Sequence, residues 1–129
     1  MTNVDVTIRG VPYPKNKSPS KEGAEKWSAD VERQTRDLPR ITEACAARVT
    51  FFLPPSRFSV DAPYGPDLDN LLKRFLDALN KTIFVGAKRN DSCIVELTAT
   101  KVKVASEETG TGARIHIAPV KLDTSSRLE

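Results

Sequence analysis

Residues 65–80 of this 129-residue chain, GPDLDNLLKRFLDALN, predict a helix whose start carries more charge than packing requires. Apolar side chains recur three and four positions apart, which is typical of an amphipathic helix with one stripe packed on a sheet. That stripe consists of Leu68, Leu71, Leu72, Phe75, Leu76 and Leu79. Off the stripe, the helix start carries polar residues that a core does not explain: Asp67, Asp69, Asn70 and Lys73.

The patterns on either side of this helix predict five more elements in one α+β domain over residues 1–129. Alternating apolar residues indicate half-buried strands, and helical spacing between Ser18-Pro19 and Pro39 indicates a first helix. The resulting order, β-α-β-α-β-β, favours a mixed sheet with both main helices on one face. The predicted strands cover residues 3–9, 46–53, 93–105 and 113–120, and the first helix covers residues 19–38.

A proline-rich loop at residues 54–66 leads directly into the helix start. We expect no regular structure in it. Loops of this length inside a compact domain are usually functional or disordered, and its position next to Asp67 favours a functional role.

The overall composition permits a phosphate-bearing partner without requiring one. Lys and Arg number 20 against 17 Asp and Glu, a net charge of +3, and residues 73–103 concentrate seven bases against three acids. Cys45 and Cys93 are isolated, which argues against a zinc or disulfide scaffold and suits a reducing compartment. Because the sequence has no apolar run of membrane-spanning length and no signal-peptide pattern, we expect a cytoplasmic protein.

The charged helix start has two interpretations on local features alone. Gly65 and Pro66 disfavour helix before them, so Asp67 is expected in a non-helical cap, where its carboxylate can converge with that of Asp69. Lys73, one turn further on, would stand beside the same point, and Mg²⁺ is commonly held by one or two carboxylates plus phosphate oxygens. The alternative is ordinary helix stabilisation by an N-cap, first-turn acids and an Asp-to-Lys pair.

A third carboxylate, Asp91, favours the metal site over the cap. The helix is about 20 Å long at 1.5 Å per residue. The segment 80–90 can span about 36 Å at most, which is enough to return along the helix. We therefore expect this segment to bring Asp91 back toward Asp67.

Taken together, PDLDNLLKRFLDAL, a short loop, NDSCIVEL and Lys101 resemble the RusA family of Holliday-junction resolvases. Members of that family are small dimeric magnesium-dependent endonucleases of bacteria and prophages. The match covers roughly residues 49–103, and the opening VTIRGVPYPKNK is similar to the family's first strand and basic loop. The family usually has two adjacent acids where this chain has Asn90-Asp91.

The resemblance implies a phosphodiester hydrolase that resolves Holliday junctions in DNA recombination and repair. It implies a homodimer that binds branched DNA, with Mg²⁺ as the cofactor and Mn²⁺ as a substitute. The roles it implies are metal binding and catalysis for Asp67, Asp69 and Asp91, phosphate-facing catalysis for Lys73, and support for Asn70 and Asn90.

Basic side chains would contact the DNA backbone, because phosphate contacts position a protein without specifying sequence. The candidates are Lys15, Lys17, Lys81, Lys88, Arg89 and Lys101. Lys101 lies about 33 Å beyond Asp91 along an unbroken strand, so we do not expect it at the same ion, and a plain surface role is its alternative. A switch in apolar parity predicts a bulge near Thr100, and His116 is expected to point outward.

A second function remains open from the sequence. The chain could be a catalytically silent DNA-junction or protein-binding module of the same fold, with its acids serving as helix caps. A divalent ion separates the two functions, since only the nuclease would cut branched DNA and only when the ion is present.

Overall fold

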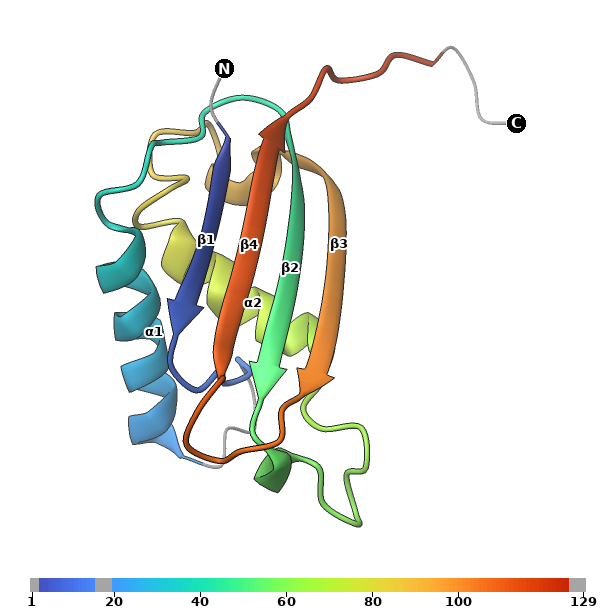
Figure 1. Ribbon diagram of the computed structural model, residues 1–129. Helices are drawn as coiled ribbons and strands as arrows, with labels where there is room; N and C mark the ends of the chain where they lie inside the picture. Colours follow the sequence, from blue (N-terminus) through green and yellow to red (C-terminus); the bar gives the residue numbers. More distant parts are fainter. Residues whose placement is uncertain (1–2, 16–19, 126–129) are drawn as a thin grey trace.

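Four strands form one mixed sheet, and two helices pack on the same face of it (Figure 1). The computed structural model describes residues 3–15 and 20–125. The predicted α+β class and the order β-α-β-α-β-β are confirmed. Along the chain the elements are β1 (Val4–Arg9), α1 (Lys21–Thr35), β2 (Cys45–Leu53), α2 (Leu68–Leu79), β3 (Ile94–Lys103) and β4 (Gly112–Pro119), with 3₁₀ turns at Pro55–Arg57 and Asn90–Cys93.

The strand order is β1-β4-β2-β3, and β2 and β3 are the parallel neighbours. A tight turn cannot join parallel neighbours, so the chain crosses over between them, and α2 lies within that crossover. α2 therefore starts near the end of the sheet where β2 and β3 finish. α2 runs obliquely behind the sheet, so its two ends lie toward opposite ends of the strands (Figure 1).

The core lies between the sheet and the two helices. Phe75 of α2 is buried at its centre, with the Trp27 ring of α1 stacked at 6.1 Å and the Phe51 ring of β2 edge-on at 5.5 Å. Burial of such a side chain contributes about 1.5–3 kcal/mol, so these rings fix both helices on the sheet. Every second residue of β2 is buried on this face: Cys45, Ala47, Val49, Phe51 and Leu53.

α1 is shorter than the helix predicted over residues 19–38. Its N-cap is Ser20, whose hydroxyl accepts a hydrogen bond of 2.9 Å from a first-turn backbone amide. The predicted cap, Ser18, lies outside the described residues. At the other end, the buried Thr35 hydroxyl bonds back to the Val31 carbonyl at 2.6 Å and to the Thr82 hydroxyl at 2.8 Å. Back-bonding of this kind competes with the helix ladder, which explains the early end.

The predicted bulge near Thr100 is wrong. β3 pairs with β2 without interruption from Glu96 to Lys103, and the register shift lies at the start of the strand, beside Cys45. The apolar parity switches because β3 is an edge strand with residues exposed on both faces. Apolar residues on such a strand do not mark a single buried face.

The loop at residues 54–66 is more ordered than predicted. It contains the 3₁₀ turn Pro55–Arg57 and two further hydrogen-bonded turns before Asp67. Among the described residues, no helix combines the length and the apolar character that crossing a bilayer requires.

Candidate active site

Asp67 occupies the N-cap position of α2, as the preceding Gly65 and Pro66 predict. Its backbone is non-helical, with φ −59° and ψ 129°, but its side chain makes no capping hydrogen bond to the described first turn. Asp67 is exposed, so the carboxylate is available to a ligand. The geometry therefore argues against the interpretation of Asp67 as an ordinary cap.

Asp69 and Lys73 lie one helical turn apart on the same exposed side of α2. Neither side chain has an ion pair with another described residue. The start of a helix carries partial positive charge, which stabilises carboxylates and would also attract a phosphate. Asn70 follows on the next position, and its carbonyl accepts a hydrogen bond of 2.9 Å from the Lys15 amide. This bond holds Lys15 against the helix start.

Asp91 lies at the opposite end of α2. Asn80, the C-cap of the helix, donates its side-chain amide to the Asp91 carboxylate at 2.9 Å. The twelve residues of α2 separate this carboxylate from Asp67 by about 18 Å. The expected return of segment 80–90 toward Asp67 within one chain is therefore wrong.

Burial explains why segment 80–90 does not return. Ile83 and Phe84 are fully buried, so this segment folds into a series of tight turns against the core instead of extending. The Ile83 carbonyl also accepts a hydrogen bond of 2.8 Å from the Ile41 amide, which ties the turns to a distant part of the chain. These interactions fix Asp91 beside the start of β3.

Two consecutive residues before Asp91 have left-handed backbone conformations. Arg89 has φ 59° and Asn90 has φ 55°, a region that residues other than glycine seldom adopt. Such strain clusters at functional sites, where the surrounding structure enforces it. The left-handed backbone of Arg89 and Asn90 turns the chain sharply between the tight turns that follow α2 and the 3₁₀ turn that contains Asp91.

Asn80 is a site residue that sequence reasoning missed. It orients Asp91 through the 2.9 Å hydrogen bond, and its own Oδ1 is buried without a described partner. Its position just after the last leucine of the helix marks it as a cap. Nothing in the local sequence shows that it reaches Asp91.

Lys101 anchors the loop before α2, a structural role that the sequence also did not reveal. Its ammonium donates to the Tyr64 carbonyl at 2.5 Å and to the Pro66 carbonyl at 2.9 Å. It therefore fixes the end of the loop that delivers Asp67 to the helix. Asp91 lies in the 3₁₀ turn just before β3, and Lys101 lies near the other end of that strand, so the two side chains are far apart, as expected.

The remaining candidate DNA-contacting residues differ in whether they already form an ion pair within the protein. Lys15 forms an ion pair with Asp77 at 2.7 Å, and Lys81 lies 3.8 Å from a carboxylate oxygen of α1. Lys88 and Arg89 are exposed and form no ion pair within residues 3–15 and 20–125. Lys17 lies outside the described residues.

Of the three predicted metal ligands, Asp67 and Asp69 lie at the start of α2 and Asp91 lies beside its other end. Asp67 and Asp69 supply the hard oxygen atoms that Mg²⁺ prefers, and two carboxylates with water and substrate phosphate suffice for that ion. In the described part of one chain, no group of three His, Cys, Asp or Glu side chains is placed to hold a metal. In one chain, two carboxylates, those of Asp67 and Asp69, therefore have the chemistry that suits magnesium.

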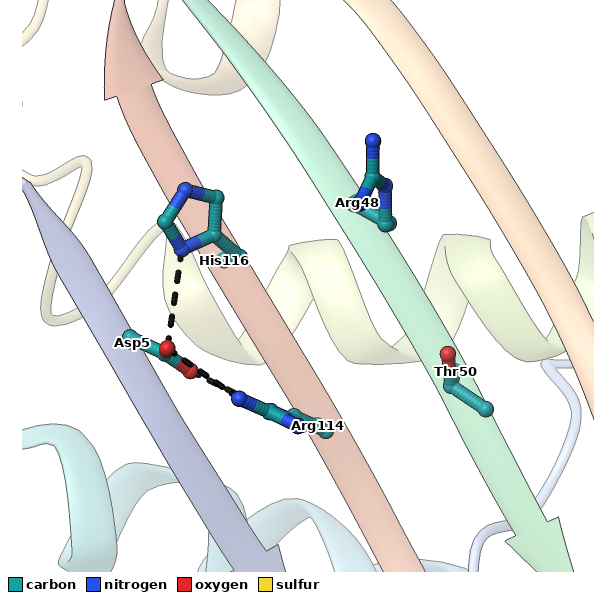
Figure 2. A pocket seen from close by; sticks show the side chains of 5 residues that line it. All are labelled: Asp5, Arg48, Thr50, Arg114 and His116. Carbon is teal, nitrogen blue, oxygen red and sulfur yellow. Dashed lines mark hydrogen bonds and ion pairs between the residues drawn. The ribbon is translucent and has the colours of Figure 1, made fainter.

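A separate polar cluster lies on the sheet face that no described helix covers, around a shallow cavity of about 270 Å³ (Figure 2). Two nitrogens of Arg114 donate to the two carboxylate oxygens of Asp5, each at 3.2 Å. These bonds lower the pKa of Asp5 and raise that of Arg114. His116 points outward as predicted, with Nδ1 3.7 Å from Asp5. The sheet separates this cluster from the carboxylates of α2, so it is not part of the candidate active site.

Comparison with known proteins matches most of the chain to one family. The family model described as endodeoxyribonuclease RusA matches residues 9–118, from the last residue of β1 into β4. The matched span contains both ends of α2 and all three predicted metal ligands. A comparison with curated proteins found no match.

Proposed function

The chain belongs to the RusA family of endodeoxyribonucleases, and we propose that it is a cytoplasmic, magnesium-dependent enzyme that resolves Holliday junctions in recombination and repair. The observation that carries the proposal is the pair of exposed carboxylates at the start of α2, because Asp67 makes no cap that would explain it. The silent binding module needs those acids as caps, so it is the weaker alternative.

A second copy of the chain would complete the site. β3 is an edge strand, and its other edge pairs with no strand of the described chain. Val95 and Leu97 on it are 44% and 43% exposed, and the neighbouring Leu72 and Leu76 of α2 are only partly buried. An edge strand that no other strand covers is a natural site for pairing with another chain.

Pairing two β3 strands antiparallel about a two-fold axis would join opposite ends of the two chains. The start of β3, with Asp91, would come to the end of the sheet where the second copy carries Asp67 and Asp69. Each site would then hold three carboxylates from two chains, and the dimer would carry two sites. A four-way junction is itself nearly two-fold symmetric, so the two sites suit paired cuts on opposing strands.

The role proposed for each residue follows from the chemistry of its side chain. Asp67, Asp69 and Asp91 would hold magnesium, which when bound activates water and neutralises charge on the phosphate. Lys73 adds a fixed positive charge one turn from Asp69, where negative charge grows as the phosphodiester is cleaved. Asn80 is the positioning residue for Asp91, and Asn70 supports the helix start. Mn²⁺ offers the same preference for oxygen ligands and is the expected substitute.

The primary test is single-turnover cleavage of a four-way junction and of a matched linear duplex, with and without Mg²⁺. We expect cutting of the junction alone, and only with the ion. Junction binding without any cutting in Mg²⁺ or Mn²⁺ would favour the silent module.

A mixing experiment tests the shared site. Asp69→Asn and Asp91→Asn should each be inactive alone. In a mixed dimer one site carries both changes and the other carries neither, so random mixing should restore about a quarter of the wild-type sites. If all three ligands of a site came from one chain, mixing would restore nothing.

A further inference from the structure

The tip of the loop before α2 presents two apolar side chains to solvent. Residues 59–64 are all exposed and project beyond the end of the sheet (Figure 1). Val60 is 97% exposed and Tyr64 is 80% exposed, the two highest values among the large apolar residues of the described chain. Single exposed apolar residues are ordinary, so the significance of these two depends on how they are held and where.

The loop holds its tip in place. The Ala62 amide donates to the Ser59 carbonyl at 3.2 Å, and the Gly65 amide donates to the Ala62 carbonyl at 3.0 Å. These two successive turns leave the tip little freedom. Val60 and Tyr64 are therefore exposed by a defined backbone and not by a loose one.

The base of the loop is anchored on both sides. The Lys101 ammonium binds the carbonyls of Tyr64 and Pro66. Gly65 has φ 74°, and a Cβ there would lie 2.9 Å from the Phe58 ring, so only glycine lets the chain pass this close. On the incoming side, the Arg57 guanidinium stacks over the Tyr13 ring at 4.0 Å.

The tip also lies beside the candidate active site. Tyr64 precedes Asp67 by three residues, and Lys101 binds the carbonyls of Tyr64 and of Pro66, the residue just before Asp67. A nucleic acid whose phosphate reaches Asp67 and Asp69 would bring its bases near this tip. In an open four-way junction, base stacking is interrupted where the arms meet, and the exposed faces of bases are apolar and aromatic. Aromatic side chains bind such faces, and apolar side chains wedge between base steps.

We propose that Tyr64 and Val60 form a base-stacking site that contacts unstacked bases at the branch point of the DNA. The proposal rests on the proposed function, because it takes branched DNA as the ligand. It adds a contact that recognises the branch itself, whereas the basic residues contact phosphates common to every duplex.

The test measures affinity in Ca²⁺, where binding is followed without cutting, for a four-way junction and a linear duplex. Tyr64→Ala should weaken junction binding by about fivefold or more, since a base–aromatic stack is worth about 1–3 kcal/mol. Duplex binding should stay unchanged, and Tyr64→Phe should restore junction affinity because it keeps the ring. Leu122→Ser, at an exposed apolar residue in the segment after β4, is the matched control and should have no effect.

Photocrosslinking locates the contact. A junction with 5-iododeoxyuridine at the branch point should crosslink to Tyr64, identified by mass spectrometry, and one with the same base mid-arm should not. Equal junction affinity for Tyr64→Ala and wild type, or no branch-point crosslink, would overturn the stacking site while leaving the nuclease intact. Dissociation of the dimer in Val60→Ser or Tyr64→Ala would overturn it in favour of a subunit contact. If the wild type bound no junction at all, both proposals would fall.

Discussion

Asp67 is the residue at which the two interpretations of the helix start can be separated by experiment. Its side chain caps nothing in the described first turn, so its removal should cost little stability. We expect Asp67→Asn to leave the melting temperature unchanged and to lower single-turnover cleavage by about 100-fold or more, because loss of a metal ligand exceeds the effect of an outer-shell partner. Asp123→Asn, on another exposed acid, should change neither quantity. Because Asn caps a helix about as well as Asp, a normal cleavage rate together with unchanged stability would restore the cap interpretation.

Asp5 gives a prediction about pH. Hydrogen bonds from Arg114 lower its folded pKa below the ordinary 3.8, so its contribution to stability is present above the unfolded pKa and is lost as pH falls through the folded value. Asp5→Asn should therefore melt slightly below wild type at pH 7, and the difference should shrink as the pH drops below 3.8. Thermal unfolding at several pH values would measure this, and a difference that grew on acidification would contradict it.

At the scale of elements, local patterns predicted what local forces determine. The leucine stripe defined α2 because period and packing agree there, and Gly65-Pro66 placed Asp67 outside the helix because those two residues restrict the backbone directly. The location of Asp91 was not accessible in this way. The position of Asp91 depends on the burial of Ile83 and Phe84 in the core. This is a tertiary effect, so it cannot be predicted from the number of residues between the acids.

The edge strand β3 carries the prediction for assembly. Leu97→Lys would place a charge on the exposed edge, which disfavours pairing with a second copy. We expect the variant to remain folded, to sediment as a monomer at micromolar concentration, and to lose cleavage. Val85→Lys, which puts the same charge on another exposed apolar residue, should remain a dimer. A monomeric wild type that cuts both strands would contradict the shared site.

For the whole molecule, the distribution of charge predicts how binding responds to salt. Lys88 and Arg89 are exposed and have no described ion partner, so they are the strongest candidates for binding phosphate. Removing both should reduce the slope of log affinity against log salt by about 0.9 for each phosphate that is no longer neutralised. Lys26→Ala with Arg33→Ala is the matched control, since both side chains already pair with Asp30 on α1. An unchanged slope in the first variant would remove these two residues from the DNA interface.

The length of α2 has a consequence for the geometry of the substrate. In the proposed dimer, the two sites lie at opposite ends of the same helix, about 18 Å apart along its axis. The two scissile phosphates must then be separated by a similar distance, so helix length sets the spacing between the nicks. Inserting one helical turn in α2 alone would displace Asp67 and Asp69 by about 5.4 Å from the partner's Asp91, which the pairing of the β3 strands fixes. Such a variant should therefore dimerise but lose cleavage.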